Sequence, residues 1–222
     1  MAAFVWLGGA MFVGALTLCA YSYAVPWSRP ATLDGGAMAI DAALFSVFAL
    51  HHSLFERESV KHWLSAAVPQ PLLRPVYVWF ASTLLIAVCL AWRPIGGGVY
   101  DLAGLSALAL NACQVIGALI ILAAVRAIDP LELAGIRPHS ANESLQIAGP
   151  YRWVRHPLYS GWLLLTFGAA HMTGDRLFFA AISTFYLLIA MPFEERSLLT
   201  TFGAAYEDYT RKVRYRIVPY VY

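Results

Sequence analysis

The chain has 222 residues, of which 60% are hydrophobic and only 13% are charged, whereas soluble domains carry about 25% charged residues. This composition, with a mean hydropathy of +0.63, excludes an ordinary soluble domain and predicts a membrane protein in contact with a lipid bilayer. The net charge of +2 is too small to indicate a nucleic-acid partner, and the basic residues gather at the ends of apolar segments.

Four apolar runs fill the N-terminal part of the chain, at residues 2–25, 37–55, 75–92 and 105–128. A helix needs about 20 predominantly apolar residues to cross a bilayer, so each run predicts one membrane span. Proline and glycine clusters separate the runs and indicate turns. Residues 56–74 between the second and third runs predict a polar loop or a surface helix.

The C-terminal part begins with a polar connection at residues 131–148. Two apolar runs follow at 157–173 and 177–193, each of 17 residues, which predicts a short helical hairpin at the low end of spanning length. The last segment, 194–213, is amphipathic, because its apolar residues recur at spacings of three and four. These residues are Leu198, Leu199, Phe202, Tyr206, Tyr209 and Val213.

We therefore expect an all-α integral membrane protein with about six transmembrane helices, the last two a short hairpin, and a C-terminal amphipathic helix. Residues 1–222 form a single membrane domain in this interpretation. Its N-terminal four-helix part, 1–130, is the substrate side, and 131–222 is the C-terminal part that holds the site.

The basic residues predict the orientation. With six spans, 12 of the 15 Lys and Arg residues fall on the side that also holds both termini. Cytoplasmic loops carry the excess of basic residues, so this side is predicted to be cytoplasmic.

Polar residues gather in the segment 149–161, where two arginines, a histidine and two tyrosines lie between apolar runs. Charge at a membrane edge is costly and usually functional. Pro157 suits the first turn of a helix and holds His156 outside helical geometry. Free N–H groups at this helix start, with Arg152 and Arg155, predict an anion site.

The pair Glu194 and Glu195 ends the last apolar run and supplies the opposite charge on the same side of the membrane. A site with both signs suits a zwitterionic or diol-bearing ligand. The residues alone leave an alternative open, in which the arginines pair with lipid phosphates and the glutamates cap a helix.

The segment Gly-Pro-Tyr-x-x-x-Arg-His-Pro-x-Tyr-x-Gly resembles the signature of integral membrane methyltransferases, the superfamily of isoprenylcysteine carboxyl methyltransferases and phospholipid N-methyltransferases. The tail is similar as well, over residues 194–219. The N-terminal half resembles the methanethiol S-methyltransferases and their NnrU-like relatives. That similarity is carried by His52-Ser53, Arg57, Lys61, Trp63, Val68-Pro69, Tyr77-Val78, Trp92-Arg93-Pro94 and Ile128-Asp129.

The resemblance implies S-adenosylmethionine as the methyl donor, S-adenosylhomocysteine as the product, and no metal. The implied donor-binding residues are Gly149, Tyr151, Arg155, His156, Pro157, Tyr159, Gly161, Glu194 and Glu195. Arg155, Arg211 and Lys212 would act on an anionic nucleophile, since neighbouring arginines lower the pKa of a thiol. His51, His52, Tyr206 and Tyr209 are the expected substrate contacts.

The expected acceptor is a small or lipophilic thiol, or an isoprenylcysteine-type carboxylate. A phospholipid amine is the alternative. Two further hypotheses stay open: an NADPH-dependent membrane reductase similar to sterol reductases, and a membrane protein that has kept the site without its activity.

Overall fold

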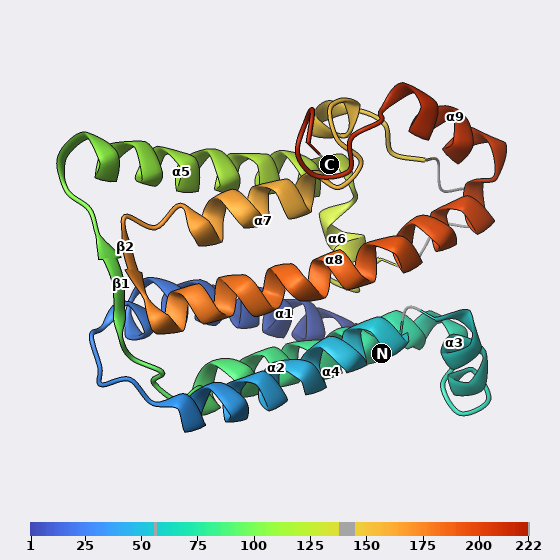
Figure 1. Cartoon of the computed structure of the whole chain (residues 1–222). Coiled ribbons are helices and arrows are strands. Elements are labelled where there is room, and N and C mark those ends of the chain that lie inside the picture. The colour runs from blue at the N-terminus through green and yellow to red at the C-terminus, as the bar shows by residue number, and fades with distance from the viewer. Residues whose placement is uncertain (56, 138–144, 222) are drawn as a thin grey trace. The chain divides into compact units, whose positions relative to one another are not determined.

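The computed structural model describes residues 1–55, 57–137 and 145–221, and the expected all-α membrane architecture is confirmed (Figure 1). Part of the predicted polar connection, residues 138–144, lies outside the described residues. Five helices in the described part of the chain are long and apolar enough to cross a membrane. They are α1 (Ala2–Ala24), α2 (Gly35–Phe55), α4 (Gln70–Ala91), α5 (Gly104–Ala127) and α8 (Gly174–Phe202). The first four match the four predicted N-terminal spans to within a few residues.

Shorter elements connect these helices. Three short helices, α3 (Glu58–Leu64), α6 (Pro130–Leu133) and α9 (Ala204–Lys212), and two 3₁₀ turns, η1 (Pro26–Ser28) and η2 (Gly149–Arg152), lie between or after them. Strands β1 (Gly98–Asp101) and β2 (His171–Thr173) pair into a two-stranded sheet, which the sequence did not predict.

Contacts between residues divide the chain into two compact units. The first comprises residues 1–98, 130–140 and 173–176; the second comprises 99–129, 141–172 and 177–222. In the first unit, α4 packs against both α1 and α2. In the second, α7 (Pro157–Phe167) packs along α5, as Figure 1 also shows. Helix α5 thus groups with the second unit by its contacts, whereas the sequence interpretation placed it among the N-terminal helices.

Asp175, at the start of α8, organises the polar core of the first unit. The residue is 2% exposed, and its carboxylate accepts hydrogen bonds from the Trp92 indole (2.9 Å), the Ile95 N–H (2.9 Å) and the Gly96 N–H (3.0 Å). Gly96 has φ +72°, and a Cβ there would lie 2.2 Å from the Thr32 carbonyl oxygen. Only glycine satisfies both demands.

The predicted helical span at 157–173 is wrong in form, because α7 ends at Phe167 after 11 residues. Gly168 lies so close to α5 that a Cβ would be 2.9 Å from the Gln114 side chain. After Gly168 the chain leaves the helix, Ala170 accepts a hydrogen bond from Leu102 N–H at 3.0 Å, and His171–Thr173 form β2. Hydropathy counts apolar residues and does not register this change from helix to strand.

Helix α7 and the residues that follow it run alongside α5. Near the start of α7, the Gln146 amide bonds the Ala127 carbonyl at the C-terminal end of α5, while Ala170 meets Leu102, just before α5 begins. An 11-residue helix rises about 17 Å, and the three residues of β2 add about 10 Å. Residues 157–173 thus follow α5 to its N-terminal end, although only part of the segment is helical.

The predicted amphipathic helix at 194–213 is also corrected. Helix α8 continues through Glu194 to Phe202, and the break comes at Gly203, whose φ is +51°. Helix α9 follows. The predicted apolar face is largely confirmed, because a cluster of Tyr206, Tyr209 and Val213 packs with Leu145, Leu198 and Phe202. The exception is Leu199, which is 42% exposed.

Candidate functional site: an ion cluster at the start of α7

The segment before α7 folds as its sequence predicts. Pro157 occupies the first helical position, and His156 precedes it with φ −121° and ψ 65°, outside helical geometry. The N–H groups of Tyr159 and Ser160 donate to the His156 carbonyl. Pro150 and Tyr151 of η2 are buried. This local geometry presents the side chains of Arg155 and His156 from a rigid turn.

Glu195 of α8 is the centre of the cluster. One of its oxygens, Oε1, accepts from Arg155 Nε at 2.7 Å and lies 3.3 Å from His156 Nε2. The other, Oε2, lies 2.9 Å from Arg216 Nη2. The Glu195 side chain is 13% exposed, Arg155 9% and His156 4%. Charge-assisted hydrogen bonds of this length in a shielded place are strong and directional, so Glu195 is held in one orientation.

Glu194 has a different environment. Its Oε2 accepts a hydrogen bond from the Tyr159 hydroxyl at 2.6 Å and lies 3.6 Å from His156 Nδ1. The side chain is 47% exposed. The rings of His156 and Tyr159 stack, with centroids 5.1 Å apart. His156 thus bridges the two glutamates, and Glu194 keeps an accessible carboxylate oxygen.

The C-terminal tail closes one side of the cluster. Arg155 N–H donates to the Tyr215 carbonyl and His156 N–H to the Arg216 carbonyl, at 3.0 and 2.8 Å. Arg155 Nη1 donates to two further tail carbonyls, those of Val213 and Arg214. These backbone and side-chain bonds hold Arg155 against Glu195 and the carbonyls of the tail.

Two tyrosines of α9 attach this helix to the same region. The Tyr209 hydroxyl donates to the Tyr151 carbonyl at 2.7 Å. Burial raises the pKa of Tyr209 to about 12, so the hydroxyl stays protonated and remains a donor. Burial also raises the pKa of Tyr206. Tyr206 is 4% exposed, yet its hydroxyl has no hydrogen-bond partner among the described residues.

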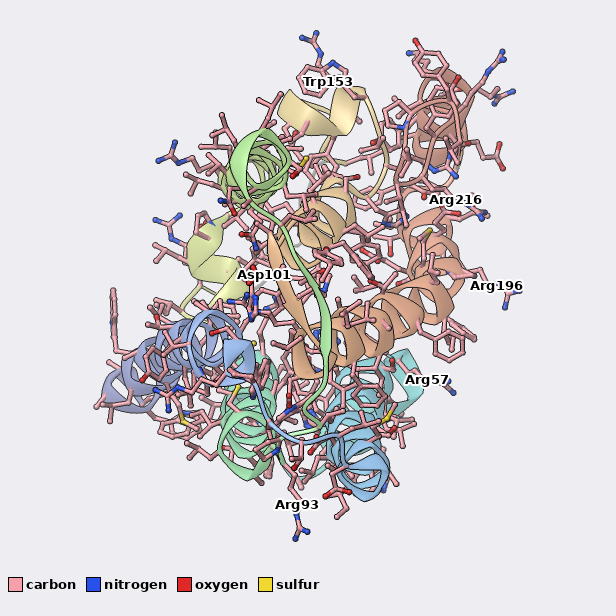
Figure 2. All side chains as sticks on the ribbon, turned by 60° about the vertical axis from the view of Figure 1, so that its left-hand side comes forward. Arg57, Arg93, Asp101, Trp153, Arg196 and Arg216 are labelled. Atoms are coloured by element: carbon pink, nitrogen blue, oxygen red, sulfur yellow. The ribbon has the colours of Figure 1, made fainter. Side chains whose placement is uncertain are left out.

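An open pocket of about 350 Å³ lies beside Glu195 in the second unit. It is lined by Pro192, Glu195, Arg196, Leu199, Tyr206, Glu207, Thr210 and Arg216. Figure 2 labels two of these residues, Arg196 and Arg216, near α8, and the side chain of Arg196 extends outward. The lining therefore combines both charges with an unpartnered hydroxyl, and such a surface suits a ligand with several polar groups.

The structure brings most of the predicted donor residues together. Arg155, His156, Tyr159, Glu194 and Glu195 form one connected network, and Tyr151, Tyr206 and Tyr209 adjoin it. The predicted substrate contacts His51 and His52 belong to the first unit.

Three predicted residues lie elsewhere. Arg211 is on the exposed side of α9, where it pairs with Asp208 at 3.0 Å, and Lys212 is exposed next to it. Gly161 faces α5, because a Cβ there would lie 2.7 Å from the Gly117 carbonyl oxygen. The close backbone approach predicted at Gly161 is thus an approach of two helices.

Sequence reasoning did not select Arg216, although its guanidinium completes the cluster around Glu195. No spacing marks it, because it reaches Glu195 only when the tail folds back over the start of α7. The available signal is the pair Arg214 and Arg216 near the end of the chain, which in sequence contributes only to the distribution of charge.

Comparison with known proteins places the chain in a family. The phospholipid methyltransferase family model matches residues 104–205. Methanethiol S-methyltransferase 2 of Bradyrhizobium diazoefficiens is 36% identical over 204 residues, covering 86% of this chain and 78% of its own. The Crocosphaera subtropica methanethiol S-methyltransferase is 33% identical, covering 83% and 76%. A Delta(14)-sterol reductase of Mus musculus is 31% identical over 102 residues, 42% of this chain and 24% of its own.

The apolar helices and the glutamate-centred cluster, together with the family match, define an integral membrane methyltransferase. The chain belongs to the family of membrane methyltransferases that includes the methanethiol S-methyltransferases.

Proposed function

We propose that this enzyme transfers a methyl group from S-adenosylmethionine to a small thiol. The observation that carries the proposal is the similarity to methanethiol S-methyltransferases over more than four fifths of the chain. It is supported by the cluster around Glu194 and Glu195, which offers carboxylate, guanidinium and hydroxyl groups beside a pocket.

The residues at the pocket fit such a donor. The donor carries an ammonium, a carboxylate and two ribose hydroxyls, and the pocket offers groups of both charges together with the unpartnered Tyr206 hydroxyl. A buried hydroxyl without a partner is costly, so a ligand that bonds it would relieve that cost. Glu194, half exposed, would accept hydrogen bonds from the ribose hydroxyls or the ammonium.

In this proposal the glutamates contact the donor, and Arg155, His156 and Tyr159 position them. They fix Glu195 and orient Glu194, and the donor would then meet a prearranged set of acceptors rather than mobile side chains. Tyr151 and Pro157 support the same turn from below the surface.

When bound, S-adenosylmethionine supplies an electrophilic methyl group on a positively charged sulfur. Attack by a thiolate neutralises both charges, so surroundings that exclude water favour the reaction over the separated ions. The chain's own contribution is to align the reactants at about 3–3.5 Å and to keep the acceptor away from bulk water.

We infer that the donor site faces the cytoplasm, where a soluble donor is available. The support is the distribution of Lys and Arg, 12 of 15 on the side of the segment 149–161 if residues 157–173 cross the membrane. His51 and His52 are the proposed acceptor contacts.

A phospholipid amine is the second candidate acceptor, favoured by the description of the matching family. The experiment that separates the two candidates incubates the purified protein in lipid nanodiscs with donor carrying a labelled methyl group. Ethanethiol, a prenylcysteine and a phosphatidylethanolamine-containing lipid extract are offered in parallel. We expect the label in the ethanethiol product. Label found only in phospholipid, or only in the prenylcysteine ester, would contradict the thiol assignment.

A further inference from the structure

His51, one turn before the end of α2, has an unusual environment. Both of its ring nitrogens, Nδ1 and Nε2, are buried and have no hydrogen-bond partner among the described residues. Most buried polar groups are bonded, and each exception calls for an explanation. Neutral imidazole offers one donor and one acceptor, so His51 holds two unused hydrogen-bonding positions inside the first unit.

Aromatic rings surround this imidazole. It stacks on Tyr77, with centroids 5.8 Å apart and planes 6° apart, and it contacts Phe55 at 4.9 Å and Phe80 at 5.9 Å. These contacts involve ring faces and edges and do not satisfy either nitrogen. The neighbouring His52 differs, because it makes edge contacts with Phe48 and Tyr77.

The covering rings can give access to the nitrogens. Phe80 is 57% exposed, so a change of its rotamer costs little packing. Phe55 is the last residue of α2, where helices fray most readily. Displacement of Phe80 or Phe55 would open a path for a small molecule to the imidazole.

We propose that His51, with Tyr77, Phe55 and Phe80, forms the binding site for the thiol acceptor, a short-chain alkanethiol. The S–H group is a weak donor and the sulfur a weak acceptor, which matches the two vacant imidazole positions. The rings supply favourable sulfur–aromatic contacts and an apolar surface for the alkyl group. The inference rests on the proposed function and names the residues that select a thiol.

The first test uses His51→Phe, which keeps the ring contacts and removes both nitrogens. We expect the KM for ethanethiol to rise about tenfold, the size of effect that loss of one hydrogen bond produces. Affinity for S-adenosylhomocysteine should stay within twofold, and the Tm should not fall, because an unsatisfied buried group has been removed. His51→Gln restores an amide donor and acceptor and should recover part of the KM. The control is His62→Gln, at an exposed position in α3. It should change neither the KM for ethanethiol nor the Tm.

A second measurement does not depend on catalysis. Imidazole ¹⁵N labelling, with the His51 signal assigned by its loss in His51→Phe, should show a shift when ethanethiol is added without donor. An unchanged ethanethiol KM in His51→Phe, or an unshifted His51 signal at saturating ethanethiol, would overturn the inference. Failure of the proposed function is a separate result, in which the wild-type protein transfers no methyl group to any thiol.

Discussion

Replacing Glu195 by glutamine tests whether this side chain is the structural centre of the proposed donor site. The substitution keeps the shape of the side chain but removes the charge that Arg155 and Arg216 share at 2.7 and 2.9 Å. Breaking a buried pair from one side costs about 3–5 kcal/mol. The lower end, about 3 kcal/mol, applies because Arg216 is 34% exposed and the amide oxygen still accepts one hydrogen bond.

For a chain of this size, about 1 kcal/mol shifts Tm by roughly 2–4 °C, so Glu195→Gln should lower Tm by about 6–12 °C. Differential scanning fluorimetry in one detergent measures the shift. The matched control is Asp208→Asn, since Asp208 is 65% exposed and pairs only at the surface with Arg211; its Tm should change by less than about 2 °C. A Glu195→Gln protein with the same Tm as the wild type would refute the assignment of Glu195 as a buried ionic centre.

Three further predictions concern other parts of the chain. Gly96→Ala should prevent accumulation of folded protein, because the new Cβ would lie 2.2 Å from a carbonyl oxygen. Gly104→Ala, at a position with a similar φ of +63° but open space, should lower the free energy of unfolding by only about 1 kcal/mol. Equal expression and equal Tm of the two variants would contradict this reasoning. Tyr209→Phe should lower stability by about 1 kcal/mol at neutral pH through loss of the bond to Tyr151. Since the folded-state pKa is raised to about 12, the difference from wild type should shrink as pH rises from 10 through 12. Arg211→Ala should retain methyl transfer within about twofold, because its partners are on the exposed side of α9; a loss of tenfold or more would return it to the site.

Much of the fold could be predicted because the first four spans are long uninterrupted apolar runs, and length alone identifies them. The segment 157–173 was harder. Its residues are as apolar as those of a helix, but Gly168 packs directly on α5 and the chain then pairs with β1. A contact with a distant segment decides the structure there, and a sequence pattern does not contain it.

The glutamate pair shows the same limit. Charge at the end of an apolar run suggested that a new helix begins at Glu194, yet α8 continues and the break is set by Gly203. The meeting of Arg155 and His156 with the glutamates was predictable from charge and sidedness. The third partner, Arg216, and the tail carbonyls that hold Arg155 depend on how the tail folds back.

The central claim is that the cluster around Glu194 and Glu195 holds the methyl donor. Isothermal titration calorimetry of the purified protein with S-adenosylhomocysteine, and separately with NADPH, tests it most directly, with Glu194→Gln as the site variant. We predict saturable binding of S-adenosylhomocysteine, no binding of NADPH, and an affinity at least tenfold weaker in Glu194→Gln. Binding of NADPH alone, or an affinity for S-adenosylhomocysteine that Glu194→Gln leaves unchanged, would contradict the account.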